Sequence, residues 1–192
     1  MRGFYQAIES QGKPGVGFHR TLGNLLPATT LYAIFPPSDF NAMNADKIKE
    51  LALDLNETTP RSPRETLAGY VVAGRALDKC RAALNGTLGD YHFDCPLDNE
   101  FLGFAEITAN AFKEFVATGA SDDEVAEWIG KNTKQRPRIE VINWNNKMRS
   151  LRVCDLDDAR QEFLEGYIPQ FVPKGRPVYV WFDVYDLEEG RM

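Results

Sequence analysis

Residues 62–86 read SPRETLAGYVVAGRALDKCRAALNG, and this stretch decides the predicted fold. Ser62, Pro63 and Glu65 supply an N-cap, a first helical residue and the third-position acid of a capping box. The residues at core-facing helical spacing are Leu67, Tyr70, Val71, Gly74, Leu77, Arg81 and Leu84. Asn85-Gly86 then tolerates the left-handed backbone that ends many helices. The stretch therefore predicts one helix that begins at Pro63 and ends near Asn85.

The same helical spacing recurs along the chain. Further helices are predicted over 45–55, after Thr108, after the capping box Ser121–Glu124, over 138–153 and over 155–167. Phe115 and Trp128 belong to the apolar stripes of two of them. The tail over 177–186 favours a strand on propensity, with a last helical turn as the alternative. These elements predict a mainly α fold, a compact multi-helix single domain with at most a short two-stranded β element.

Residues 1–42 differ from the rest, because glycines and prolines interrupt them and no regular period is sustained. A helical pattern begins just after Met43. The sequence therefore predicts a loop-like or poorly ordered extension over 1–42 and a single helical domain over 43–192.

Composition narrows the function classes. Of 192 residues, 43% are hydrophobic and 26% are charged, which is ordinary for one globular domain. The net charge of −6, with no basic stripe, argues against nucleic acid or an anionic membrane as a partner. Cys80, Cys95 and Cys154 are an odd, widely spaced set, which predicts a cytoplasmic location without a disulfide framework. No segment has the pattern of an export signal or a membrane span.

One short segment gathers reactive residue types, and it reads Tyr91-His92-Phe93-Asp94-Cys95-Pro96-Leu97-Asp98. Pro96 suits the first position of a helix, so Cys95 is predicted to be the N-cap. A thiol there faces backbone N–H groups and the positive end of the helix dipole, which favour a nucleophilic thiolate. A buried packing role for Cys95 is the alternative.

Nearby charges decide whether that thiol is reactive. The acids that oppose a thiolate are Asp94, Asp98 and Glu100. The cations that would favour it, if they reach the sulfur, are Arg75, Lys79 and Arg64. The sequence leaves this balance open.

Residue types suited to bind a metal ion or an anion occur in two places. His92, Asp94, Cys95 and Asp98 are metal-ligand types, but their spacing matches no zinc template, so no metal is predicted and no cofactor is identified. Arg61 and Arg64, beside Ser62, are suited to hold an anion at a helix N-terminus, with plain capping as the alternative. The candidate binding residues are Arg61, Arg64, Arg75, Asp78, Lys79 and Asp98.

Several ordered motifs are characteristic, namely 60–65 with 67–70, 78–82, 89–98, 121–124 with Trp128, and 181–183. Through these motifs most of residues 50–190 resembles DUF5069, a bacterial family catalogued as a domain of unknown function. The resemblance leaves residues 1–42 outside and implies a compact domain that begins near Met43. The family has no assigned activity, so it implies no functional residues. The tail is a departure, since Leu187-Glu188-Glu189-Gly190 stands where the family tends to continue with paired aspartates and glycine.

No activity can be assigned from the sequence. The favoured hypothesis is a non-catalytic module that binds another protein, because the reactive residue types also serve as caps and ion pairs. The alternative is a small-molecule-binding protein or an enzyme with a cleft around Cys95 and His92. Its candidate catalytic residues are Cys95, His92 and Asp94. The partner, the ligand and the oligomeric state are not identified.

Overall fold

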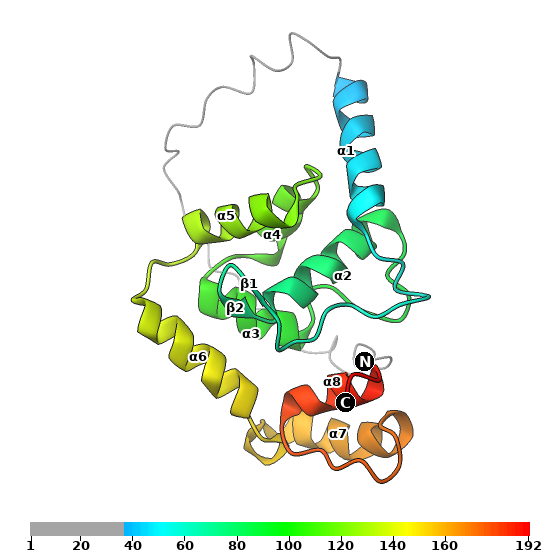
Figure 1. Ribbon diagram of the computed structural model, residues 1–192, viewed down its shortest axis with the longest axis vertical. Helices are drawn as coiled ribbons and strands as arrows, with labels where there is room; N and C mark the ends of the chain where they lie inside the picture. Colours follow the sequence, from blue (N-terminus) through cyan, green and yellow to red (C-terminus); the bar gives the residue numbers. More distant parts are fainter. Residues whose placement is uncertain (1–36) are drawn as a thin grey trace.

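In the computed structural model, the backbone is described for residues 37–192 and the side chains for residues 43–192. This part of the chain holds eight α-helices, a short 3-10 helix and one two-stranded antiparallel sheet (Figure 1). The elements are α1 (Pro37–Leu51), β1 (Thr66–Leu67), β2 (Tyr70–Val71), α2 (Ala73–Asn85), α3 (Pro96–Ala105), α4 (Ala109–Val116), α5 (Asp122–Asn132), α6 (Arg138–Ser150), η2 (Val153–Asp155), α7 (Asp158–Phe171) and α8 (Trp181–Glu188). The predicted fold class is confirmed.

The predicted start of the central helix is wrong. β1 and β2 form a hairpin in the first third of the stretch, and α2 begins ten residues after Pro63, at Ala73. Ala68 and Gly69, the two turn residues, have φ of 52° and 83°, as the tightest hairpin turn requires. The end of the helix is confirmed, because Gly86 follows Asn85 in the left-handed conformation.

The signals at Ser62 and Glu65 are real, but they close a turn instead of starting a helix. The Ser62 backbone N–H donates to the Glu65 carboxylate at 3.1 Å, and the Arg64 N–H donates to the Ser62 hydroxyl at 3.1 Å. A distant side chain then holds the hairpin. Asn145, in α6, accepts from the Val71 N–H at 3.1 Å and donates to the Gly69 carbonyl at 2.7 Å. The local sequence pattern gives no sign of this contact between Asn145 and the hairpin.

Helix α2 forms the centre of the fold (Figure 1). Every residue from Ala73 to Ala82 is buried, including four charged ones. The helix packs against α1, α3, α4 and β1. Charged side chains in such a position must find partners, because an isolated buried charge is very costly.

Most other helix starts follow their sequence signals. Cys95 caps α3, Thr108 caps α4, and Ser121 with Glu124 forms the capping box of α5, all as predicted. α6 and α7 also occupy the predicted regions, with ends shifted by a few residues. Tyr91–Phe93 lies in a loop and turn and forms no strand.

In the tail the favoured strand does not form, and the helical alternative is the one observed. Residues 181–188 form α8, and only Val180 makes a single antiparallel bridge, to Arg152. The Asp183 carboxylate accepts from the backbone N–H groups of Tyr179 and Val180, each at 3.0 Å, and so caps the helix start. Residues from Trp181 to Leu187 are all buried, so the β-branched and aromatic side chains are needed for packing around the whole helix.

At the other end, α1 begins at Pro37, before the predicted boundary at Met43, and ends at Leu51, before the predicted end at Leu55. Residues 1–36, which make up most of the predicted extension, lie outside the described part of the chain. The division at residue 42 therefore stays a prediction.

Candidate functional site

Cys95 occupies the predicted position at the N-terminus of α3. Its sulfur accepts from the Asp98 backbone N–H at 3.5 Å, and the Asp98 carboxylate accepts from the Cys95 N–H at 3.4 Å. Asp94, just before it, has a φ of 64°, and its carboxylate accepts from the Asn99 amide at 3.0 Å. Asp94 therefore shapes the turn into the helix.

Of the three cations considered for Cys95, it is Lys79 that reaches the sulfur. Its Nζ lies 3.1 Å from Cys95 Sγ, 2.8 Å from Asp98 Oδ1 and 3.0 Å from the His92 carbonyl oxygen. The side chains of Lys79 and Asp98 are 3% and 0% exposed. Burial alone would lower the pKa of Lys79, but the charges of Asp98 and Cys95 outweigh it and the pKa is raised. Lys79 is thus a buried ammonium between a carboxylate and a half-buried thiol.

His92 takes part in this cluster through its backbone carbonyl, which accepts from Lys79. Burial, together with the Lys79 charge, lowers the pKa of its imidazole. The ring is therefore neutral at pH 7, since its ordinary value is already about 6.5. A neutral imidazole can both donate and accept a hydrogen bond, and the catalytic role of His92 stays a prediction.

Arg75 lies before Lys79, near the start of α2, and pairs with Glu189 in the tail. Its two terminal nitrogens donate to the Glu189 carboxylate at 2.9 and 2.5 Å, and both side chains are almost fully buried. The guanidinium lies 5.6 Å from the ring centre of Tyr91 and 4.9 Å from that of Tyr185. A cavity of about 290 Å³ lies beside this pair. Sequence reasoning missed Glu189, because nothing local links it to a residue 114 positions away.

The remaining candidate cations also pair with carboxylates. Arg61 binds Asp78, with contacts of 2.7 to 3.1 Å, and reaches Asp122 at 2.7 Å. Arg64 binds Asp183 at 2.5 Å and also pairs with Asp186 in α8. All six candidate binding residues therefore lie in ion pairs, and each pair involving Arg61, Arg64, Arg75 or Lys79 joins separate segments of the chain.

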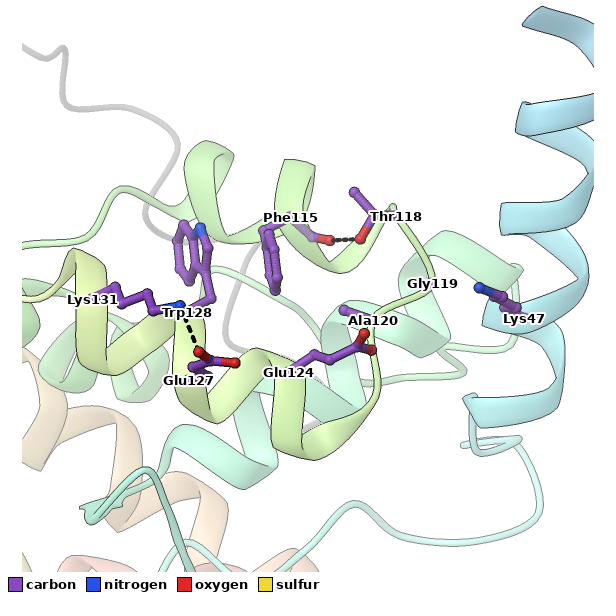
Figure 2. A pocket seen from close by; sticks show the side chains of 9 residues that line it. All are labelled: Lys47, Phe115, Thr118, Gly119, Ala120, Glu124, Glu127, Trp128 and Lys131. Atoms are coloured by element: carbon purple, nitrogen blue, oxygen red, sulfur yellow. Dashed lines mark hydrogen bonds and ion pairs between the residues drawn. The ribbon is translucent and has the colours of Figure 1, made fainter. Parts of the chain in front are cut away.

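A different surface carries an open pocket, of about 280 Å³, between α4, α5 and α1 (Figure 2). Phe115 and Trp128 form one wall as stacked rings, with centres 5.0 Å apart and planes at 11°. Both rings pack against the hydrophobic core, as their spacing predicts, and both are only partly buried. Glu124 and Glu127 stand on the rim, and Lys131 pairs with Glu127 at 2.5 Å.

The chain contains a second stacked pair of the same kind, Phe104 with Trp144, with ring centres 4.6 Å apart. There an arginine completes the arrangement. The Arg136 guanidinium lies 4.4 Å from the Phe104 ring centre and binds Glu106 at 3.0 Å. Among the described residues, no such cation lies over Phe115 or Trp128.

No three or more His, Cys, Asp or Glu side chains in the described part of the chain converge in a way that would hold a metal ion. None of its helices has the length and apolar character needed to cross a bilayer.

The buried ion pair of Glu189 predicts that the stability of the fold depends on pH. Burial would raise the pKa of Glu189, but Arg75 and Arg191 outweigh it, and the pKa is lowered from 4.5. The unfolded chain therefore binds the proton more readily than the folded one. This stabilisation is present above about pH 5 and is lost as pH falls through the folded pKa. We expect the free energy of unfolding to fall with decreasing pH, with a slope of about 1.4 kcal/mol per pH unit for each such proton.

Urea titrations between neutral and acid pH measure this slope, and Glu189→Gln should flatten it. An equal slope in this variant would contradict the assignment.

The model of a family described as "Domain of unknown function (DUF5069)" matches residues 57–191. No curated protein matches the chain.

Proposed function

The chain belongs to the DUF5069 family, which has no assigned function, and from the geometry of its sites we propose that it is a non-catalytic module that binds another protein. The specific proposal is that the pocket of Phe115 and Trp128 receives an arginine side chain from a basic segment of the partner. The observation that carries it is the partly buried, stacked ring pair that lines a pocket with a carboxylate on its rim.

The use of the motif residues supports a non-catalytic role. Arg61, Arg64, Arg75 and Lys79 each bind a carboxylate on another segment, and in each pair the acid is nearly fully buried. Such pairs fix the relative positions of the helices. Moving one of these cations onto a substrate would leave a carboxylate buried without its partner, which is costly.

The chemistry of the pocket suits a guanidinium. Aromatic faces attract cations, most strongly those of tryptophan, and a carboxylate beside the ring adds a charged hydrogen bond. Phe104, Trp144, Glu106 and Arg136 form this arrangement inside the same chain. The net charge of −6 also favours a basic partner.

The resident lysine is a weak competitor for the proposed arginine. Lys131 and Glu127 are 68% and 66% exposed, and such surface pairs contribute only about 0–1 kcal/mol. Lys47 stands on the opposite side of the pocket from Trp128 and Glu127 (Figure 2). An arginine seated over Trp128 would therefore meet Glu127 and avoid the repulsion of Lys47.

The test is calorimetric titration with a peptide of alternating glycine and arginine, alongside a peptide with glutamine at each arginine. We expect saturable binding of the arginine peptide alone. Trp128→Ala should weaken it about tenfold, the size of a partly desolvated cation–π contact. Glu127→Gln should weaken it more than Glu165→Gln, which removes an equal charge from an exposed position on α7. Equal affinity of Trp128→Ala and the parent protein would exclude the pocket.

A cytosolic location and a bacterial origin belong to the same proposal. The location is supported by the three cysteines, which are all free. The enzyme or small-molecule hypothesis has one specific observation in its favour, namely the contact of Lys79 with Cys95. If the parent protein failed to bind the arginine peptide, the enzyme or small-molecule hypothesis would be unaffected.

A further inference from the structure

Cys95, Lys79 and Asp98 form a cluster that the binding pocket does not use. A half-buried sulfur, a buried ammonium 3.1 Å away and a backbone N–H at 3.5 Å meet at the N-terminus of α3. Both donors point at the sulfur, and both stabilise a negative charge on it. We propose that Cys95 is a site of oxidation by hydroperoxides and that Lys79 is its positioning residue. This inference does not depend on the proposed function.

The reaction balances as a two-electron oxidation of sulfur. The thiolate attacks one peroxide oxygen, an S–O bond forms, the O–O bond breaks, and the leaving alkoxide takes up the proton that the thiol released. Cysteine and hydroperoxide thus yield a sulfenic acid and an alcohol, or water when the peroxide is hydrogen peroxide. Lys79 stabilises the negative charge on the attacking sulfur and can donate to the new oxygen afterwards. A small monothiol returns the cysteine by forming a mixed disulfide with loss of water, which a second monothiol then reduces.

The three cysteines provide internal comparisons. Cys80 is fully buried in α2, and burial raises the pKa of its thiol to about 12. Cys154 is the most exposed of the three, but its neighbour is a carboxylate, with its sulfur 3.8 Å from Asp155 Oδ1. If exposure alone decided reactivity, Cys154 would react first. If the ammonium decides it, Cys95 reacts first.

The Asp98 carboxylate allows a test in which the oxidation rate should change in the direction opposite to that in a Lys79 variant. It shares Lys79 with the sulfur, so its charge competes with the thiolate for the same ammonium. Asp98→Asn keeps the shape and the backbone N–H that caps Cys95, while it removes the competing charge. Oxidation of Cys95 should accelerate in Asp98→Asn and slow in Lys79→Gln.

The experiment exposes the full chain to one equivalent of hydrogen peroxide and traps sulfenic acid with a cyclic 1,3-diketone. Mass spectrometry of the digest then gives the rate at each cysteine. We expect Cys95 to be trapped about tenfold faster than Cys154 in the parent protein, because an ammonium contacts its sulfur whereas a carboxylate contacts that of Cys154. Faster or equal trapping at Cys154 would overturn the proposal without any variant.

The variants refine the result, and Cys80 reports on whether they stay folded. While Cys80 remains unlabelled, Asp98→Asn should raise the Cys95 rate and Lys79→Gln should lower it about tenfold. An unchanged rate in Lys79→Gln with Cys80 protected contradicts the role of Lys79. If Lys79→Gln exposes Cys80, Asp98→Asn and the comparison within the parent protein still decide the question.

Discussion

Arg75→Met is expected to lower the free energy of unfolding by about 3 kcal/mol, because it leaves Glu189 buried without its main partner. Breaking a buried pair from one side typically costs about 3–5 kcal/mol. The lower end applies because Arg191 and the Tyr91 hydroxyl still bind Glu189. The variant also loses the contacts of the guanidinium with two tyrosine rings. Urea unfolding followed by circular dichroism measures the change.

Two further variants separate the buried charge from the loss of a side chain. Arg75→Met/Glu189→Gln should recover part of the stability, because no uncompensated charge is then buried. Arg152→Met removes an arginine from an exposed pair with Asp155 and should cost far less stability than Arg75→Met. Additive losses in the double variant would show that the pair is not coupled, contrary to the contacts.

The contrast between Cys95 and Pro63 shows which helix starts the sequence can predict. Both positions carry a correct local signal, and the hydrogen bonds expected at Cys95 and at Ser62 are both present. Only at Cys95 does a helix follow. Near Pro63 the chain turns back at Ala68-Gly69, and a side chain from α6 holds it there. Local signals predict caps and turns, whereas the element that follows depends on tertiary contacts.

The candidate site shows the same limit. The sequence shows that Asp94 and Asp98 stand close to Cys95 along the chain. In the structure Asp98 contacts Cys95, and Asp94 shapes the turn before it. The partner of Cys95 could be narrowed to three cations, and the fold selected Lys79. Helical spacing correctly placed Phe115 and Trp128 on the core-facing side of their helices, but it could not show that both rings also line an open pocket. Pairings over long separations, such as Arg75 with Glu189, leave no periodic signal at all.

The tail offers the strongest test of the observed packing, through Phe182→Ala. In a strand the side chains would alternate between two faces, whereas in α8 both Trp181 and Phe182 are buried. Phe182 is fully buried, so its truncation should cost about 3–5 kcal/mol, from lost apolar contact and the cavity left behind.

Tyr179→Ala is the matched control for Phe182→Ala, because this nearby aromatic side chain is 71% exposed. Its truncation should change stability by no more than about 0.5 kcal/mol. Thermal and urea unfolding of the two variants give the comparison. Similar losses at the two positions would contradict the observed packing, in which Phe182 lies in the core and Tyr179 lies in solvent. A large loss at Phe182 alone would agree with the core position that this side chain has in α8.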